Sequence, residues 1–367
     1  MGGSTYSVYV TFHGSGSKAE NNILAIPWSG SAPSQPLKKP HADLLEKKPA
    51  GYTYSEMRGM ALDELGLLYV ANGSKDDSAV YAFGTLQDGV RSPIATLVAQ
   101  AANPGIDHPY GLALNPSPSG GGALFVSNQN SNAVCAYIVD GGTAPQATPT
   151  VVAPYLINLD PKGTFYPGET VASQLGVTEG TITPPNVPAP AGLSMSWNPN
   201  VAGDADAYTD ADADVPDAAK KKKPAKHSVR GVLYVGGTLF VADEDNGSVN
   251  LYDAVNGTYV SQVTGLDGPV GLAFDASNAL VYIAAKSSIS TYDTRSGSLT
   301  TVMSGLSEVS GIAVGPDGYV FYASRADMAV YVFSPQQQQR IDGLVVGAIP
   351  IAVDLKDEPE CLLIGPA

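Results

Sequence analysis

A short pattern recurs along this chain: a glycine, an aliphatic residue, a small residue and a second aliphatic residue. Its copies begin at Gly59, Gly111, Gly192, Gly271 and Gly311, and a sixth copy, Pro350–Val353, has proline in place of the glycine. The last three copies begin 40 and 39 residues apart, and the longer spacings elsewhere leave room for insertions. A unit repeated at this period predicts a fold built from stacked structural repeats.

Each repeat is predicted to contain several short strands. The glycine strand is followed by an apolar strand such as Leu68–Asn72 or Leu239–Asp243, and then by an alternating strand such as Val80–Phe83. Short β-branched and aromatic runs between Gly, Asn and Asp turns are typical of β-propeller blades. Small residues are expected in the first strand, because the first strands of all blades crowd together near the axis of the ring.

We therefore predict an all-β fold, in which residues 1–367 form one six-bladed β-propeller with four-stranded antiparallel blades. Only the short run Cys361–Ile364 follows the sixth copy, whereas Tyr6–Phe12 and Asn22–Trp28 read as strands without a glycine strand of their own. Because an incomplete blade would leave exposed strand edges, we expect the N-terminal strands to complete the last blade.

The strings Leu68–Asn72 and Leu239–Tyr252 resemble the YVTN and NHL families of propeller repeats. The proline that precedes the glycine strand in His108–Gly111 is similar to the NHL pattern in particular. The resemblance covers roughly residues 55–355 without the insertions. It implies the fold, but propellers of this kind serve as enzymes, scaffolds and binding modules alike.

Composition restricts the partners of the chain. Its 367 residues include 20 Lys and Arg against 35 Asp and Glu, a net charge of -15, which argues against nucleic acid as a partner because phosphate contacts need a basic surface. No apolar run reaches the ~18 residues of a membrane span, and the 2 cysteines are too few for a disulfide framework. We expect a soluble, acidic monomer, either cytoplasmic or secreted with a leader that this chain lacks.

Two segments interrupt the repeats. Residues 155–190 are rich in proline, and we expect them to fold over the channel mouth on the face of His108; inert decoration is the alternative. Residues 198–230 are expected to leave the opposite face. We predict no cofactor. Because aspartates alternate in this segment, a divalent cation such as Ca²⁺ is the alternative, with Asp210, Asp212 and Asp214 as weak candidate ligands. An EF-hand would need glycine at Val215 and glutamate at Lys221, so a solvated loop is the competing interpretation.

The predicted ligand site is the channel mouth on the face where the glycine strands begin, because propellers commonly bind ligands in this hollow. The candidate catalytic residues are His108, Glu56 and Arg58, which would supply acid–base groups. The candidate ligand-binding residues near the same mouth are Tyr54, Tyr110, Asn72, Asn128 and Asp243. The competing interpretation is structural, since Asn and Asp at strand ends commonly form turns and His108 could cap backbone groups.

The metal-dependent gluconolactonases are also six-bladed, and in that family acidic or amide residues directly before some inner strands hold a divalent cation. The matching positions in this chain are Arg58, Tyr110, Ala191, Val270, Ser310 and Ile349. None of them is a carboxylate, so we do not expect that metal chemistry here.

Two functions of different class remain open from the sequence. The first is a binding module that presents its top-face channel to a small molecule, a glycan or a protein. The second is an enzyme of hydrolase, lyase or isomerase type, with His108, Glu56 and Arg58 as its acid–base groups in the same channel.

Overall fold

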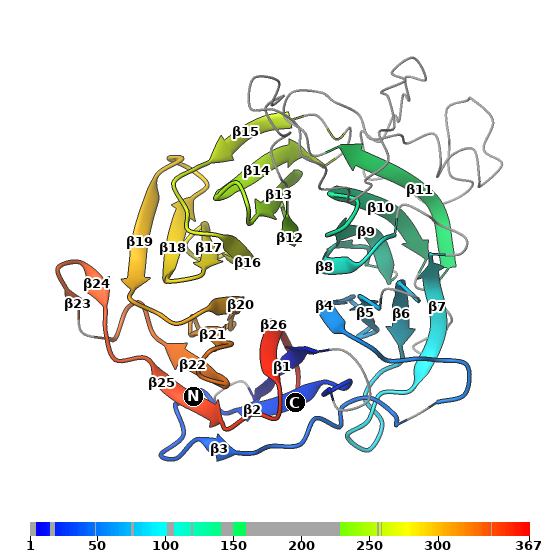
Figure 1. Ribbon diagram of the computed structural model, residues 1–367, viewed down its shortest axis with the longest axis horizontal. Coiled ribbons are helices and arrows are strands. Elements are labelled where there is room, and N and C mark those ends of the chain that lie inside the picture. Colours follow the sequence, from blue (N-terminus) through cyan, green and yellow to red (C-terminus); the bar gives the residue numbers. More distant parts are fainter. Residues whose placement is uncertain are drawn as a thin grey trace, which may run out of the picture.

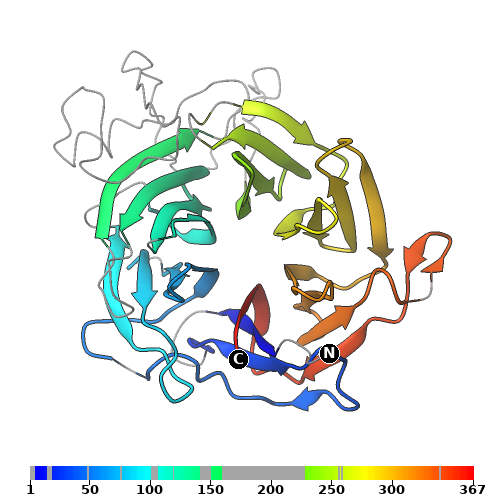
Figure 2. The ribbon, with the colours of Figure 1, turned by 180° about the vertical axis from the view of Figure 1, so that it is seen from behind.

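The computed structural model describes residues 5–14, 19–47, 49–74, 77–100, 106–118, 120–140, 150–158, 228–254, 257, 259–338 and 340–367. These residues form 26 β-strands and no helix. Twenty-four of the strands make six small sheets that stand around a central axis as the blades of a propeller, and the other two form a separate hairpin (Figure 1; Figure 2). The predicted all-β, six-bladed fold is confirmed.

The first four blades each contain four antiparallel strands in sequence order, counted from the axis outward. Blade one consists of β4 (Met57–Leu62), β5 (Leu68–Asn72), β6 (Ala79–Phe83) and β7 (Pro93–Ala99). Blade two consists of β8 (Pro109–Pro116), β9 (Gly121–Asn128), β10 (Ala133–Asp140) and β11 (Thr150–Asn158). Blade three consists of β12 (Val229–Val235), β13 (Thr238–Asp243), β14 (Ser248–Asp253) and β15 (Tyr259–Val263). Blade four consists of β16 (Pro269–Asp275), β17 (Leu280–Ala285), β18 (Ser288–Asp293) and β19 (Leu299–Ser304).

The last two blades depart from this plan. Blade five contains β20 (Val309–Val314), β21 (Val320–Ser324), β22 (Ala329–Phe333) and β25 (Ile349–Val353), and β3 (Leu37–Lys38) pairs with its outer edge. A small hairpin, β23 (Arg340–Ile341) and β24 (Leu344–Val345), precedes β25. Blade six contains β26 (Glu358–Pro366), β1 (Tyr6–His13) and β2 (Leu24–Trp28). The two ends of the chain thus share one blade, as predicted, but that blade has three strands rather than four.

Two inner strands differ from the sequence prediction. Blade three begins with β12, whose glycine is Gly231, and not with the stretch at Gly192. The stretch at Pro350 is the outer strand of blade five, where Ala352 pairs with Val330 of β22, and the inner strand of blade six is β26. The error at Pro350 arose because a run of apolar and small residues satisfies an inner and an outer strand equally well, and the stretch at Gly192 lies outside the described residues.

The predicted insertions both belong to the connection from β11 to β12. Residues 155–158 end β11 and residues 228–230 begin the third blade, so the placement of the two segments on opposite faces no longer has a basis. Residues 159–227 lie outside the described residues. The predicted lid falls mostly in this segment, and the cation candidates Asp210, Asp212 and Asp214 fall wholly in it.

Glycine positions explain how tightly the inner strands approach one another. A Cβ on Gly59 would lie 2.5 Å from the carbonyl oxygen of Tyr110, and one on Gly231 would lie 2.5 Å from that of Val270. Gly111, Gly271 and Gly311 meet the next inner strand in the same way. Cys361 occupies the sixth position, so the junction between blades six and one is the only one of the six that carries a side chain there.

The pairing register brings two sets of residues to one face, which we call the top face. The first residues of the inner strands pair with the last residues of the second strands, as in Met57 with Asn72, Pro109 with Asn128 and Glu358 with His13. Side chains that lie about 300 residues apart in the chain therefore meet around the top of the channel.

No helix among the described residues is suited to crossing a membrane.

Candidate functional site

Two positions in every blade supply the residues around the top of the channel. The first is the residue directly before the inner-strand glycine or its equivalent: Arg58, Tyr110, Arg230, Val270, Ser310 and Glu360. The second directly follows the second strand: Gly73, Gln129, Glu244, Lys286, Arg325 and Gly14. Backbone hydrogen bonds fix the second set, as in the 3.1 Å bond from the Gln129 N–H to the His108 carbonyl. Charged residues therefore gather here from five of the six blades, and blade two contributes Tyr110 and Gln129.

Glu360 is the most enclosed of these groups, with none of its side chain exposed. Its Oε2 lies 3.0 Å from Nδ1 of His13 and 3.9 Å from Nη1 of Arg58. Its Oε1 accepts hydrogen bonds from Nη2 of Arg325 and from the hydroxyl of Tyr110. Burial alone would raise the pKa of Glu360, but the contact with His13 and the charges of Arg58 and Arg325 hold it well below its usual range. Glu360 is therefore a carboxylate anchored by blades one, two, five and six.

The three candidate catalytic residues come together in the structure. Nη2 of Arg58 donates a 3.2 Å hydrogen bond to Oε2 of Glu56, and the same oxygen lies 3.7 Å from Nε2 of His108. Burial and the positive charge of Arg58 lower the pKa of His108, although Glu56 opposes this effect. His108 is thus held as a neutral imidazole beside a carboxylate at neutral pH.

A third group of charges extends the cluster across blades three and four. Nε of Arg230 donates a 2.7 Å hydrogen bond to Glu244, and its Nη1 donates one of 2.7 Å to Oε1 of Gln129. The guanidinium also lies 5.0 Å above the ring of Tyr110, a cation–π contact. Glu244 in turn is 3.7 Å from Nζ of Lys286. Sequence reasoning assigned no role to Arg230, Gln129, Glu244 or Lys286.

These groups form an arc of alternating charge, here named the charge ring: Lys286, Glu244, Arg230, His108, Glu56, Arg58, Glu360, Arg325 and, beside Glu360, His13. Apart from its two histidines, the ring holds four cations and three carboxylates. Its two ends, Lys286 and Arg325, are both cations and stand on the neighbouring blades four and five. The inner-strand residues between them, Val270 and Ser310, are uncharged. No ion pair among the described residues joins these two ends, and the exposed Glu308, directly before β20 of blade five, holds the position in this sector that Glu56 holds in blade one.

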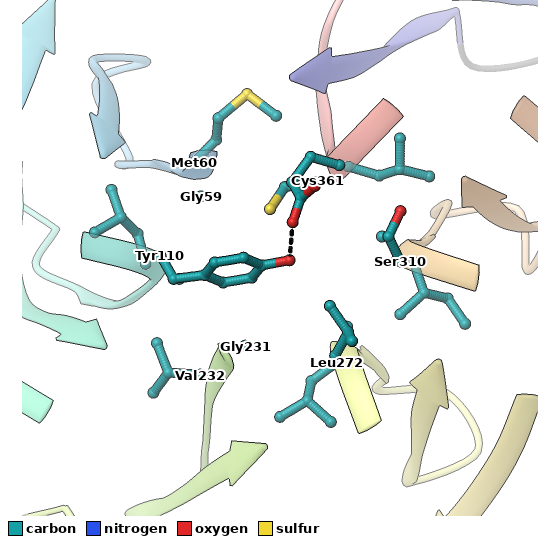
Figure 3. Close-up of a pocket in the computed structure, with 16 residues that line it drawn as sticks. Gly59, Met60, Tyr110, Gly231, Val232, Leu272, Ser310 and Cys361 are labelled. Atoms are coloured by element: carbon teal, nitrogen blue, oxygen red, sulfur yellow. Dashed lines mark hydrogen bonds between the residues drawn. The ribbon is translucent and has the colours of Figure 1, made fainter. Parts of the chain in front are cut away.

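A cavity of about 60 Å³ lies within the channel. Tyr110, Ser310 and Glu360 line it at the level of the charge ring. Deeper walls come from the residues that follow the inner-strand glycines: Met60, Leu112, Val232, Leu272, Ile312 and Leu362. Figure 3 shows Tyr110 reaching into this space, with its hydroxyl bonded to Glu360 and the Cys361 sulfur nearby. Polar and apolar residues of all six inner strands therefore line the cavity.

Most of the candidate ligand-binding residues make contacts within the protein. Asn72 and Asn128 are fully buried, and Asp243 is 2 % exposed. Each accepts a hydrogen bond from the backbone of the segment before an inner strand: from Ser55 at 2.9 Å, Asp107 at 3.2 Å and Ser228 at 3.1 Å, respectively. This repeated contact favours the structural alternative for all three residues.

The two tyrosine candidates lie in different places. Tyr54 packs its ring against Tyr81 and Phe83 in blade one, and its buried hydroxyl has no hydrogen-bond partner in the part of the chain that the structure describes. Tyr110 lies in the channel with its ring fully buried. Of the two, only Tyr110 touches the charge ring.

Two of the positions compared with the gluconolactonases change with the corrected inner strands. Arg230 replaces Ala191, and Glu360 replaces Ile349. A carboxylate does therefore stand before one inner strand, contrary to the sequence-based prediction. The carboxylate of Glu360 already contacts Arg58, Arg325 and Tyr110. The described residues contain no group of three or more His, Cys, Asp and Glu side chains that suits a metal ion.

No protein-family model matches the chain, and no curated protein matches its sequence. Solved structures do match over nearly the whole length. A putative 6-phosphogluconolactonase from Bacteroides fragilis has a TM-score of 0.57 at 15% identity, covering 98% of each chain. A chain of a nidogen/laminin complex has a TM-score of 0.51 at 12% identity, covering 99% of this chain and 98% of that one. A protein from Lactobacillus plantarum scores 0.50 at 12% identity, covering 99% of both. At such identities these similarities establish the propeller fold alone.

Proposed function

We propose that this protein is a binding module that takes a small anionic molecule at the top mouth of its channel. The observation that supports the proposal is that the charge ring ends in two cations, Lys286 and Arg325, which no ion pair among the described residues joins. An anion placed between these two cations would pair with both. A charged group held between two cations at a partly enclosed site interacts with them more strongly than it would in water.

The state of the two cations fits this role. Nη2 of Arg325 is engaged by Glu360 and Tyr110, whereas its buried Nε has no hydrogen-bond partner among the described residues. The side chain of Lys286 is 55% exposed, and Glu244 at 3.7 Å is its only ion-pair partner among the described residues. A guanidinium donates two parallel hydrogen bonds to a carboxylate or phosphate, and a nearby ammonium adds a second positive charge.

The local charge of the mouth opposes the charge of the whole chain. The net charge of -15 repels anions at long range, whereas the charge ring has one excess positive charge. Salt screens both effects between exposed groups, while contacts at a partly enclosed site are screened less. Binding would therefore rest on short-range pairing with the two cations rather than on attraction from a distance.

Anion binding can be tested by calorimetry with sulfate and phosphate on the full chain. We expect weak saturable binding that Arg325→Gln and Lys286→Gln each reduce by about tenfold, equivalent to about 1.4 kcal/mol. Lys38→Gln removes the same charge at an exposed position on the outer strand β3 and serves as the control. Equal affinities for all four proteins, or no binding of either anion, would refute the proposal.

An enzymatic role is the second candidate, and the contact between His108 and Glu56 favours it. A neutral imidazole can take a proton from a bound substrate, and a carboxylate at 3.7 Å would stabilise the imidazolium that forms. One structural neighbour is described as a putative 6-phosphogluconolactonase. Assays should compare anionic esters and lactones as substrates. His108→Gln is expected to abolish any turnover while it leaves anion affinity within about twofold, since the substitution changes no charge at neutral pH.

A further inference from the structure

One carboxylate connects the proposed anion site to a partly exposed histidine. Oε1 of Glu360 accepts a hydrogen bond from Nη2 of Arg325, one of the two cations of that site, and Oε2 of Glu360 lies 3.0 Å from Nδ1 of His13. The imidazole and the guanidinium therefore contact the two oxygens of the same buried carboxylate, on the order of 7 Å from each other. A charge on His13 acts over this distance on Arg325 and on any anion bound beside it.

His13 is placed so that its charge can change in the folded protein. Its side chain is 43% exposed, so a proton can reach the imidazole from solvent. Its Nδ1 and Oε2 of Glu360 are buried, and neither atom has a hydrogen-bond partner elsewhere in the described chain. Two atoms without a proton would repel each other at 3.0 Å, so we place the proton of the neutral imidazole on Nδ1, and Nε2 takes up the second one. Histidine is the side chain whose charge ordinarily changes between about pH 5 and pH 8.

The other charged groups on the elements packed against this end of β1 keep their charge over most of that range. They are Glu360, Arg58 and Arg325 of the charge ring, Glu56 before β4, Glu358 opposite His13 in the β1–β26 pair, Asp357 beside Gly14, and the ion pair of Glu20 with Lys356. The pKa of Glu360 lies well below its usual range, and arginine and lysine stay positive. Carboxyl groups ordinarily take up protons only below about pH 5. Within the described residues, His13 is therefore the group at this end of the ring that changes its charge.

We propose that His13 regulates the anion site with pH, so that its protonation strengthens the binding of an anion between Arg325 and Lys286. The inference rests on the proposed function and adds how that site is regulated. The negative charge of Glu360 offsets part of the positive charge of Arg325. A protonated His13 pairs with the same carboxylate, which leaves more of the charge of Arg325 for the ligand. One added unit charge about 10 Å from an anion at a partly enclosed site should raise its affinity about fivefold.

Calorimetry with sulfate at a series of pH values tests the inference, because the charge of sulfate is constant between about pH 8 and pH 5.5. At constant ionic strength, which keeps screening equal, we expect affinity to rise about fivefold as the pH falls over this range. His13→Gln keeps a polar side chain beside Glu360 and removes the titration, so its affinity should stay at the level of the unsubstituted protein at high pH. His13→Lys carries a fixed charge and should bind at the higher level throughout. His41→Gln, at an exposed position, is the matched control and should keep the full pH dependence.

Proton uptake gives a second readout on the unsubstituted protein. If protonation of His13 favours the anion, the anion must favour protonation of His13 by the same factor. Sulfate binding should therefore take up protons, which calorimetry in buffers of different ionisation enthalpy detects, and should move the NMR titration of the His13 imidazole to higher pH. Burial and Arg58 lower the pKa of His108, so its separate NMR signal should titrate at more acidic pH. Urea unfolding would verify that each variant is folded.

The outcomes separate this inference from the proposed function. If sulfate binds equally well at both ends of the pH range, or if His13→Gln keeps the pH dependence, the inference is overturned while anion binding stands. A loss of affinity on acidification would also overturn it, because the protonated imidazole would then weaken the site. If sulfate binds at no pH in this range, the inference and the proposed function fail together.

Discussion

The carboxylate of Glu360, on the last strand of the chain, lies 3.9 Å from the guanidinium of Arg58 in blade one, the first blade in sequence. The contact crosses the junction between blades six and one, where Cys361 stands in place of the inner-strand glycine. Nη1 of Arg58 also donates a 3.2 Å hydrogen bond to the Phe12 carbonyl on the other side of that junction. The same residues thus close the ring and build the charged mouth of the channel.

Replacing the Glu360 carboxylate should lower the stability of the protein and also loosen the side chains that it holds at the channel mouth. Glu360→Gln leaves Arg58 and Arg325 without their buried counter-charge, and we expect the free energy of unfolding to fall by about 3 kcal/mol. Urea unfolding measures the change. Glu308→Gln is the control, because this glutamate is exposed on blade five and should shift stability by less than about 0.5 kcal/mol. Equal losses for the two variants would show that the buried carboxylate has no special role.

His108 should make stability depend on pH in the mildly acidic range. Burial and Arg58 lower its pKa in the folded protein, so the unfolded chain takes up a proton at a higher pH than the folded one does. Its stabilising contribution is complete above the unfolded value of about 6.5 and is lost as the pH falls toward the folded value. In His108→Gln this part of the pH dependence should disappear, whereas in His41→Gln, at an exposed position, it should remain. Unfolding in urea at a series of pH values measures this dependence. If both variants kept the pH dependence of the unsubstituted protein, His108 would not be its source.

The glycine junctions predict a contrast between two inner-strand positions. In Gly231→Ala the added Cβ would lie 2.5 Å from the Val270 carbonyl oxygen, so the inner strands must move apart, at a cost of about 1–3 kcal/mol. Cys361→Ala occupies the equivalent position in blade six, which already accommodates a Cβ, and should cost less than that. Thermal unfolding of the two variants makes the comparison. If the alanine were tolerated equally at both positions, the close approach of the strands would not require glycine.

Much of the fold was predictable because strands with alternating or continuous apolar residues carry a strong local signal. The second strand of blade one was predicted with the bounds that the structure has, Leu68–Asn72. The inner strand of blade three was missed, although Gly231 precedes Gly271 by the same 40 residues that separate Gly271 from Gly311. Requiring this spacing, rather than the best local match at Gly192, would have found it.

The candidate site was only partly accessible from sequence. Glu56 and His108 were found because they directly precede recognisable inner strands, and Arg58 because it directly precedes the glycine of one. Glu360 was missed, because its strand has Cys361 where the others have glycine, and nothing local distinguishes it from a second strand. Arg325 and Glu244 follow second strands in polar turns, and only the ring closure brings their side chains to the same mouth.

The structural role of Asn128 can be separated from a role in ligand binding. Its amide accepts a hydrogen bond from the Asp107 N–H at 3.2 Å and donates one to the Val126 carbonyl at 3.0 Å. Asn128→Ala leaves these buried groups without partners, and we expect a loss of about 1–3 kcal/mol in unfolding free energy. Anion affinity should remain within about twofold, because the side chain is fully buried away from the charge ring. A loss of affinity without a loss of stability would restore Asn128 as a ligand-binding residue.

Residues 37–46, here named the strap, run along the outside of the three-stranded blade six (Figure 1). At one end β3 pairs with β25 of blade five, and at the other Leu45 bridges to Arg91 beside β7 of blade one. Leu44 and Leu45 are buried, and the side chain of Asn22 accepts the Leu45 N–H at 2.8 Å and donates to its carbonyl at 2.9 Å. The strap therefore connects both neighbours of the blade that lacks a fourth strand.

The strap should set the local stability of ring closure. Asn22→Ala removes both hydrogen bonds to Leu45, and we expect amide hydrogen exchange to accelerate in the strap, β1, β2 and β26, while blades three and four keep their protection. Unfolding free energy should fall by about 1–3 kcal/mol. Asn278→Ala is the matched control, since it removes a 2.7 Å side-chain hydrogen bond to Asp275 within a hairpin of blade four. Exchange that accelerates evenly over all six blades would mean that the ring opens as one unit, and that the strap does not hold its junction.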